Sequence, residues 1–217
     1  NNFKQRKLKK NHMTIGILKC TKENLIAMVP QVVSKLIKSE YSVLIETNAG
    51  KNSGYSNELY KEAGAEIVSR NDVLTSSDII LTGVGIEVED IHLIKDNTLL
   101  IGKFNARVES EMLTNLKYSE AKVFSLDLLP RSSIAQSMDV LSSLASLSGY
   151  KAVIAAGNEF SGYLSMMTTS AGTIPPAKVL ILGAGVAGLQ AIATAKRLGA
   201  VVNAFDVRAS VKEEVES

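Results

Sequence analysis

The sequence is organised around residues 178–206, which read KVLILGAGVAGLQAIATAKRLGAVVNAFD. The apolar run at 178–182 predicts one short buried strand, and a G-x-G-x-x-G turn follows it at once. The Ala-rich run at 189–198 predicts a helix ending before Gly199, and Val201–Phe205 predicts a second strand. Strand, turn, helix and strand in this order predict a dinucleotide-binding unit rather than an isolated tight turn in an ordinary α/β domain.

Each glycine of the turn has a predicted task. Gly183 permits the sharp change from strand to helix, and Gly185 lets a pyrophosphate approach the backbone. Gly188 allows close packing of the helix on the strand. The helix start then offers free N–H groups and a partial positive charge to the pyrophosphate.

Asp206 stands at the end of the second predicted strand, 18 residues after Gly188. Its carboxylate is expected to accept hydrogen bonds from the adenosine ribose and to repel a 2′-phosphate, so NAD(H) is the predicted cofactor. The predicted cofactor-binding residues are Gly183, Ala184, Gly185, Val186, Ala187, Gly188, Asp206, Val207 and Arg208.

Composition is that of an ordinary globular protein, with 46% hydrophobic and 21% charged residues among 217. Residues 1–12 carry five basic residues and no acid, which leaves 19 basic and 22 acidic residues elsewhere. The net charge of residues 13–217 is therefore −3, and a negatively charged protein surface does not attract the phosphates of nucleic acid. Cys20 is the only cysteine, so a disulfide within the chain and a Cys-rich metal site are excluded. His12 and His92 are the only histidines, which argues against a His-based zinc site or a Ser-His-Asp triad. No run of 18 apolar residues is present, so the sequence predicts no membrane span.

Strand-like and helix-like segments alternate between residues 13 and 126, which predicts a parallel sheet covered on both faces. The predicted strands are Thr14–Leu18, Ser42–Glu46, Glu66–Ser69, Asp78–Thr82, Thr98–Gly102 and Lys122–Leu126. The predicted helical stretches begin at Pro30, follow Ser56, and lie around Val88–Ile94 and Glu109–Leu116. Gly83–Gly85 is interpreted as a loop. Residues 134–158 predict one long apolar helix, which we expect to be buried between layers or domains.

A polar cluster precedes this helix and contains Arg131, Gln136, Asp139 and Ser142. Asp139 and Ser142 are three residues apart and share one helix face. Such groups can hold a carboxamide and a ribose. The alternative is a solvated helix start at which Ser137 or Asp139 acts as a cap, and composition alone favours that alternative.

Three stretches carry a family resemblance: LDLLPRSSIAQSMDVLSSLASLSGYKAV, MMTTSAGTIPPAKVLILGAGVAGLQAIATAKRLGAVV and FDVRASVKEEVES. They resemble the NAD(H)-binding domain, in the alpha subunit or its N-terminal part, of proton-translocating NAD(P)+ transhydrogenase. The match is nearly continuous from residue 126 to residue 217, and looser before it.

The resemblance implies an α/β fold of two Rossmann-like domains with parallel sheets. Residues 1–12 are expected to form a disordered basic tail and 13–126 the N-terminal domain. Residues 127–172 are expected to form a nicotinamide-contacting loop and a long inter-domain helix. Residues 173–217 are expected to supply the first β-α-β of the NAD-binding domain, truncated at its C-terminus.

The resemblance also implies the activity, an Re/Si-specific hydride transfer between NAD(H) and NADP(H) coupled to proton movement. Arg131, Asp139 and Ser142 would orient the carboxamide, and Gln136 would point toward the second nucleotide. The implied partners are an NADP(H)-binding component, a membrane proton-channel component and a second copy in a homodimer. The implied location is the cytoplasmic face of a bacterial inner membrane, or the matrix side in a eukaryotic organelle.

Alanine dehydrogenase shares this architecture and is one alternative. That family has Arg-Arg where this chain has Asn24-Leu25, and a catalytic Lys in the segment matching Leu81–Gly85. It has a catalytic His in the segment matching 103–105. This chain has no Lys in the first segment and no His in the second, which favours transhydrogenase over alanine dehydrogenase. Amino-acid oxidation requires a carboxylate-binding Arg and a proton-shuttling His. A non-catalytic nucleotide-binding module is the other alternative.

Overall fold

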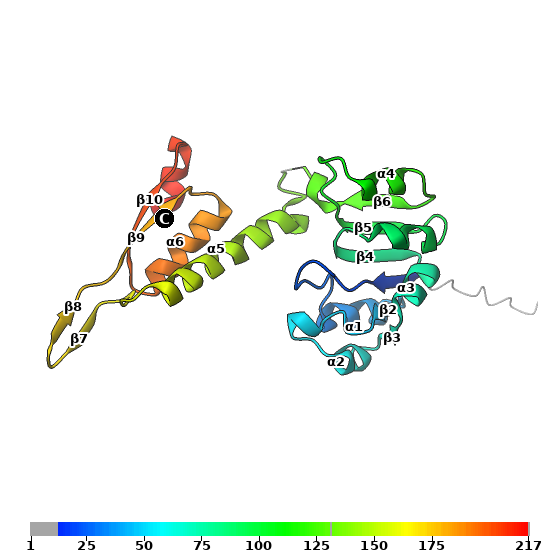
Figure 1. The fold of residues 1–217 in the computed structure, drawn as a ribbon, viewed down its shortest axis with the longest axis horizontal. Coiled ribbons are helices and arrows are strands. Elements are labelled where there is room, and N and C mark those ends of the chain that lie inside the picture. The colour runs from blue at the N-terminus through cyan, green and yellow to red at the C-terminus, as the bar shows by residue number, and fades with distance from the viewer. Residues whose placement is uncertain (1–12, 131, 217) are drawn as a thin grey trace, which may run out of the picture. The chain divides into compact units, whose positions relative to one another are not determined.

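The computed structural model describes residues 13–130 and 132–216, and it divides into two compact units, residues 1–135 and 136–217 (Figure 1). The predicted basic tail and Arg131 lie outside the described residues. Each unit has its own sheet and its own apolar core, so each is described by itself.

The first unit contains a six-stranded parallel sheet in the order β3-β2-β1-β4-β5-β6. The strands are β1 (Thr14–Ile17), β2 (Ser42–Glu46), β3 (Glu66–Val68), β4 (Ile79–Val84), β5 (Leu99–Lys103) and β6 (Lys122–Ser125). The chain moves outward from β1 in one direction and then returns to pair β4 with its other side. This reversal makes β1 and β4 the switch point, where open α/β sheets form a crevice at their carboxyl ends.

Short helices connect these strands. They are α1 (Pro30–Lys38), α2 (Asn57–Glu62), α3 (Arg70–Ser76) and α4 (Glu111–Lys117), with the 3-10 turns η1 (Lys51–Ser53), η2 (Val88–Leu93) and η3 (Leu126–Leu128). Pro30 occupies the first turn of α1, as its fixed φ favours. Helix α3 was not predicted, and it is held by a reciprocal capping box between Ser69 and Asp72.

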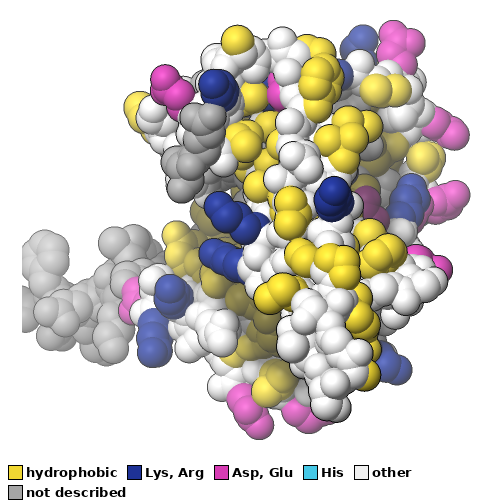
Figure 2. Space-filling model, turned by 90° about the vertical axis from the view of Figure 1, so that its left-hand side faces the viewer, with side chains coloured by type: hydrophobic (Ala, Val, Ile, Leu, Met, Phe, Trp, Pro, Cys, Tyr) yellow, Lys and Arg dark blue, Asp and Glu magenta, His cyan; other side chains and the backbone are white. Residues whose placement is uncertain are grey.

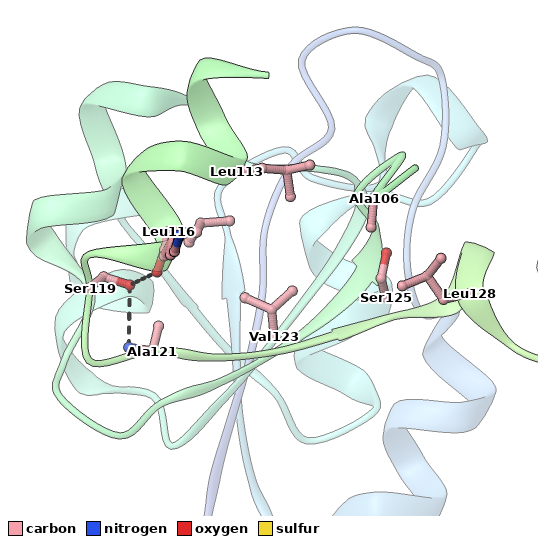
Figure 3. A pocket seen from close by; sticks show the side chains of 9 residues that line it. Ala106, Leu113, Leu116, Ser119, Ala121, Val123, Ser125 and Leu128 are labelled. Carbon is pink, nitrogen blue, oxygen red and sulfur yellow. Dashed lines mark hydrogen bonds between the residues drawn. The ribbon is translucent and has the colours of Figure 1, made fainter. Parts of the chain in front are cut away.

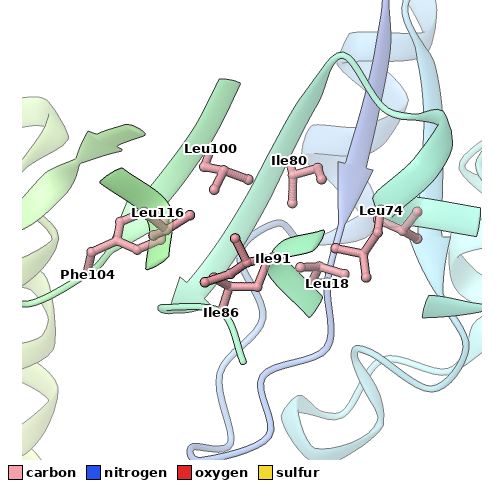
Figure 4. Packing of buried hydrophobic residues seen from close by; sticks show 9 residues of the cluster. Leu18, Leu74, Ile80, Ile86, Ile91, Leu100, Phe104 and Leu116 are labelled. Carbon is pink, nitrogen blue, oxygen red and sulfur yellow. The ribbon is translucent and has the colours of Figure 1, made fainter. Parts of the chain in front are cut away.

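Two apolar clusters pack on opposite faces of this sheet, because neighbouring strand residues point in opposite directions. Ile80 belongs to the cluster that includes Leu74, Leu100 and Phe104 (Figure 4). Leu81, the next residue, packs against the other cluster, around Val33, Val43, Ile45 and Tyr60. Helices therefore cover both faces, as the alternating sequence pattern predicted. The interpretation of 83–85 as a loop was wrong in part, since β4 continues through Val84.

The second unit begins with the 3-10 turn η4 (Gln136–Met138) and the long helix α5 (Val140–Glu159). An antiparallel hairpin of β7 (Met167–Thr169) and β8 (Gly172–Ile174) follows. Then come β9 (Lys178–Leu182), α6 (Val186–Arg197) and β10 (Val201–Phe205), with β10 parallel to β9. The 3-10 turn η5 (Ala209–Val211) and α7 (Lys212–Glu216) complete this unit. The predicted β-α-β order is confirmed. The prediction that residues 178–182 form a buried strand was wrong, since Leu180 and Leu182 on β9 are exposed and none of the described residues of that strand is buried.

Helix α5 differs from the prediction in two respects. It begins at Val140 rather than at residue 134, because the 3-10 turn precedes it and Asp139 caps it. It was expected to be buried, yet among the described residues Gly149 and Val153 are its only buried members. One side of the helix packs on α6, and Leu147 and Tyr150 are exposed outside that contact.

By length and composition, α5 is the one helix of the described residues that satisfies the criterion for a membrane span, with a mean hydropathy of 1.2. The helix is not an unbroken apolar run of the kind that the sequence was searched for, since several serines and Lys151 interrupt it. A single such helix is weak evidence for a membrane span, since core helices of globular proteins have the same length and composition. On the face drawn in Figure 2, hydrophobic side chains gather in several groups between the charged ones.

Candidate functional site

The turn between β9 and α6 is built as its glycines predict. Gly183 has a φ of 92°, and its N–H donates to the carbonyl of Phe205 at 2.7 Å. A Cβ on Gly188 would lie 1.8 Å from the carbonyl oxygen of Gly183. A side chain at position 188 is therefore incompatible with the close approach of α6 to the end of β9.

The start of α6 has the properties of an anion-binding site. Gly185 is the N-cap residue, and a Cβ at Gly183 or Gly185 would meet no atom within 4 Å. Within the described part of the chain, no side chain caps this end and no acidic residue lies in its first turn. The first N–H groups of the helix therefore face open space, where they can donate to a pyrophosphate.

Asp206 is the first residue beyond β10, and its carboxylate joins the glycine turn to Arg208. Its Oδ2 accepts the N–H of Ala184 at 2.8 Å, and its Oδ1 accepts the backbone N–H of Arg208 at 2.8 Å. The guanidinium of Arg208 donates through Nε to Oδ1 and through Nη2 to Oδ2, both at 3.0 Å. These bonds, chiefly the one from the Arg208 side chain, hold the pKa of Asp206 well below its usual range. The carboxylate is therefore ionised at neutral pH.

Helices α5 and α6 cross at a glycine. A Cβ on Gly149 would lie 2.1 Å from the carbonyl oxygen of Ala187, which belongs to the first turn of α6. One turn earlier, Ser146 Oγ donates to Gln190 Oε1 at 3.1 Å. Small residues, among them Ala191 and Ala195, line the same contact. Helix α5 therefore fixes the position of the helix start that faces open space.

The polar cluster before α5 is partly brought together. Asp139 is the N-cap of α5, and its Oδ1 accepts the N–H of Ser142 at 2.9 Å. Ser142 Oγ donates to Asp139 Oδ2 at 2.7 Å. Gln136 lies in the preceding 3-10 turn, where its carbonyl accepts the N–H of Asp139 at 3.2 Å. Arg131 lies outside the described residues. Asp139 thus caps the helix, as the alternative interpretation proposed, and at the same time it fixes the hydroxyl of Ser142.

The carboxyl edge of the first sheet carries a second network, which the sequence did not reveal. The carboxylate of Asp127 accepts the successive backbone N–H groups of Phe104, Asn105 and Ala106 at 2.9–3.2 Å. Ser125 Oγ donates to the same carboxylate at 2.6 Å. Burial raises the pKa of Asp127, but the hydrogen bonds from Ser125 and the amides outweigh it and lower the pKa. This is an anion nest filled by the protein's own side chain.

Arg70 makes a further ionic network at this edge. Its guanidinium contacts Glu46 Oε2 at 2.9 Å and Asp90 Oδ2 at 2.6 Å. Glu46 Oε2 also accepts the N–H of Lys19 at 2.7 Å. The opposite charges neutralise one another, and the network links α3, β2, η2 and the segment that follows β1.

A pocket of about 370 Å³ lies between α4 and β6 in the first unit (Figure 3). Leu113, Leu116 and Val123 give it an apolar lining. Its two hydroxyls are engaged within the protein, since Ser119 Oγ donates to the carbonyl of Leu116 and Ser125 Oγ donates to Asp127. Among the described residues of the lining, Lys117 is the one charged residue, so a single ammonium group rather than a set of convergent polar groups is available to a ligand there.

Comparison with known proteins places this geometry in a family. Residues 16–148 match the family described as alanine dehydrogenase/PNT, N-terminal domain, and residues 152–217 match the corresponding C-terminal domain. The chain belongs to the alanine dehydrogenase/PNT family. The glycine turn and Asp206 fall in the C-terminal family domain, and the Asp127 nest falls in the N-terminal one.

Within the alanine dehydrogenase/PNT family, similarity is higher to transhydrogenases. The chain is 43% identical over 196 residues to NAD(P) transhydrogenase subunit alpha of Cereibacter sphaeroides, covering 90% of this chain and 38% of that protein. The crystal structure of transhydrogenase from Sinorhizobium meliloti superposes with a TM-score of 0.89 at 40% identity, covering 94% of this chain and 61% of that one. Alanine dehydrogenase of Bacillus subtilis is 28% identical over 203 residues, covering 91% of this chain and 53% of that protein. The chain spans about half or less of the length of these curated relatives.

Proposed function

We propose that this chain is the NAD(H)-binding part of a proton-translocating, Re/Si-specific NAD(P)+ transhydrogenase. The observation that carries the proposal is the open glycine turn at the start of α6, with an ionised carboxylate beside it. The higher identity to transhydrogenase alpha subunits than to alanine dehydrogenases selects the reaction.

The residues of the second unit fit NAD(H). The N–H groups at the start of α6 would hold the pyrophosphate, and Gly185 leaves room for it. Asp206 would bind the adenosine ribose, and its charge disfavours a 2′-phosphate. When bound, the cofactor supplies or accepts a hydride at its nicotinamide ring.

The chain's own residues have positioning roles in this proposal. Because a hydride carries both electrons with it, the transfer needs no acid or base from the protein. Arg131, Asp139 and Ser142 would orient the carboxamide, and the bond from Ser142 to Asp139 supports a fixed geometry for both groups. Gln136 would point toward the NADP(H) nucleotide. The contribution of these residues is orientation and exclusion of water.

The first unit supports transhydrogenase over amino-acid oxidation. In the segment where alanine dehydrogenases resemble this chain and carry a Lys, Thr82 is buried and donates its hydroxyl to the carbonyl of Gly85 at 2.6 Å. In the segment where they carry a His, Phe104 lies in the apolar core. Thr82 is held by its hydrogen bond to the backbone and Phe104 is packed in the core, so neither side chain can shuttle a proton.

Assembly with partners is part of the same proposal. We infer an NADP(H)-binding component and a membrane proton-channel component as partners, and a homodimer of this chain. The uncovered side of α5 supports the homodimer, since its apolar residues Leu147 and Tyr150 are 60% and 47% exposed. The protein would face the bacterial cytoplasm, or the matrix of a eukaryotic organelle. Light scattering after size-exclusion chromatography checks the dimer.

Two measurements test the function. Nicotinamide fluorescence titration should show tight binding of NADH and weak binding of NADPH. Asp206→Ala should weaken the binding of NADH and reduce the preference for NADH over NADPH. Mixing the protein with the NADP(H)-binding component should then produce hydride exchange between the two nucleotides. Equal affinity for both nucleotides would contradict the assignment of NAD(H). Selective binding without hydride exchange would instead favour a non-catalytic nucleotide-binding module.

A further inference from the structure

The inference concerns Arg208, which faces the carboxylate of Asp206 with two of its nitrogens. The guanidinium makes a bidentate ion pair at 3.0 Å for both bonds. The side chain of Asp206 is only 9% exposed, whereas that of Arg208 is 56% exposed. The positive group therefore lies at the surface, over a nearly buried carboxylate.

The pair sits at the adenosine end of the proposed nucleotide site. Asp206 follows the carboxyl end of β10 and binds the N–H of Ala184 in the glycine turn. In folds of this type, the residue at this position contacts the 2′-hydroxyl of NAD, and a nearby Arg accommodates the 2′-phosphate of NADP. Both side chains are present here, and they are bound to each other.

Arginine is suited to phosphate because its planar fork matches two oxygens at once. In this protein the fork is matched to the two oxygens of Asp206 instead. A 2′-phosphate would have to displace a carboxylate that is ionised and also held by two backbone N–H groups. The same carboxylate would repel the incoming phosphate.

We propose that Arg208 is a latent 2′-phosphate ligand, and that selectivity for NAD(H) arises because Asp206 engages its guanidinium. This inference rests on the proposed function and names the residue pair that sets nucleotide choice in it. Removing the charge of Asp206 alone should therefore do more than relax selectivity. It should create affinity for NADPH that depends on Arg208.

The test compares four forms of the protein: unchanged, Asp206→Asn, Arg208→Gln and the double variant. Binding of NADH and NADPH is measured by nicotinamide fluorescence, and adenosine 2′,5′-bisphosphate is the competitor that reports on the adenosine end. Asp206→Asn should tighten NADPH about 10- to 100-fold, the range for a charge-assisted hydrogen-bonded pair. Arg208→Gln alone should gain no NADPH affinity, and the double variant should lose the gain.

Asp206→Ser is a second variant in case the amide disturbs the glycine turn, because the hydroxyl still offers an acceptor to Ala184. Thermal melting shows that each variant is folded. The proposal is overturned if neither Asp206 variant gains NADPH affinity, or if the gain persists without Arg208. In those cases selective NADH binding by the unchanged protein would leave the proposed function standing. If the unchanged protein bound neither nucleotide, both the function and this inference would be wrong.

Discussion

Replacing Gly149 with alanine tests whether the crossing of α5 and α6 sets the nucleotide site. The new Cβ would lie 2.1 Å from the carbonyl oxygen of Ala187, so the helices must separate by more than about 1 Å to restore ordinary contact. Overpacking of this kind lowers the free energy of unfolding by about 1–3 kcal/mol. The higher helix propensity of alanine offsets this by up to about 1 kcal/mol. The moved group is the first turn of α6, which would bind the pyrophosphate.

Gly157→Ala is the matched control, because it is the same exchange in the same helix. Its Cβ would meet only the flexible end of Leu164, at 3.1 Å. We expect Gly157→Ala to be as stable as the unchanged protein or more so, and Gly149→Ala to be about 2 kcal/mol less stable than Gly157→Ala in urea unfolding followed by circular dichroism. NADH should bind Gly149→Ala about tenfold more weakly, which is the effect of losing one charge-assisted hydrogen bond. Equal stability and equal NADH affinity of the two variants would refute the role of the crossing.

Three further substitutions test other parts of the molecule. Asp127→Ala should lower the free energy of unfolding in urea by about 2–4 kcal/mol, because several donors lose their acceptor. The folded-state pKa of Asp127 is lowered, so this stabilisation is fully present above the unfolded pKa of about 4. The difference between the variant and the unchanged protein should shrink as the pH falls from there through the lower folded-state pKa. Gly188→Ala should lower the melting temperature, because its Cβ would collide with the carbonyl of Gly183. Gly185→Ala should keep the melting temperature of the unchanged protein and lose NADH binding, because its Cβ points into the space left for the pyrophosphate. A stable Gly188→Ala variant that binds NADH would contradict this account of the turn. Gln136→Ala should slow hydride transfer on the order of 100-fold with little change in NADH affinity, and a normal rate would leave Gln136 as a solvated helix-start residue.

The parallel strands were largely predictable, because local apolar runs and Gly or Pro boundaries carry the information. Ser42–Glu46 and Lys178–Leu182 have the bounds that the sequence predicted, and α1 begins at Pro30 as expected. Helix α3 was missed because it is only seven residues long and has little apolar periodicity. The available signal was Ser69 followed by Asp72, a spacing typical of a capping box.

The start and the burial of α5 were wrong for different reasons. Its start was placed too early because residues 134–139 continue the helical pattern, although Asp139 offers a capping side chain. Its burial was inferred from composition, but composition does not reveal which partner covers an apolar stripe. Gly149 marks the covered stripe, and Leu147 lies about 160° away around the helix.

The candidate site was predictable where it depends on local spacing. The glycine turn and the position of Asp206 follow from one continuous stretch, and the structure builds both as expected. The Asp127 nest joins residues more than 20 positions apart, so it became visible only once β5 and β6 were paired. The ion pair of Asp206 with Arg208 is local, but a two-residue spacing is too common to indicate a bidentate contact.

The nest at Phe104–Ala106 also bears on which small molecules the first unit can take up. The anion in the nest is the carboxylate of Asp127, which is part of the same chain. Its effective concentration at the nest is therefore about millimolar or more, independent of the solution. Free phosphate or a metabolite carboxylate must compete with that tethered group and with the hydroxyl of Ser125 that binds it. The loop after β5 therefore has its conformation set without any diffusible ligand, and its hydrogen-exchange protection should be the same in buffers with and without phosphate.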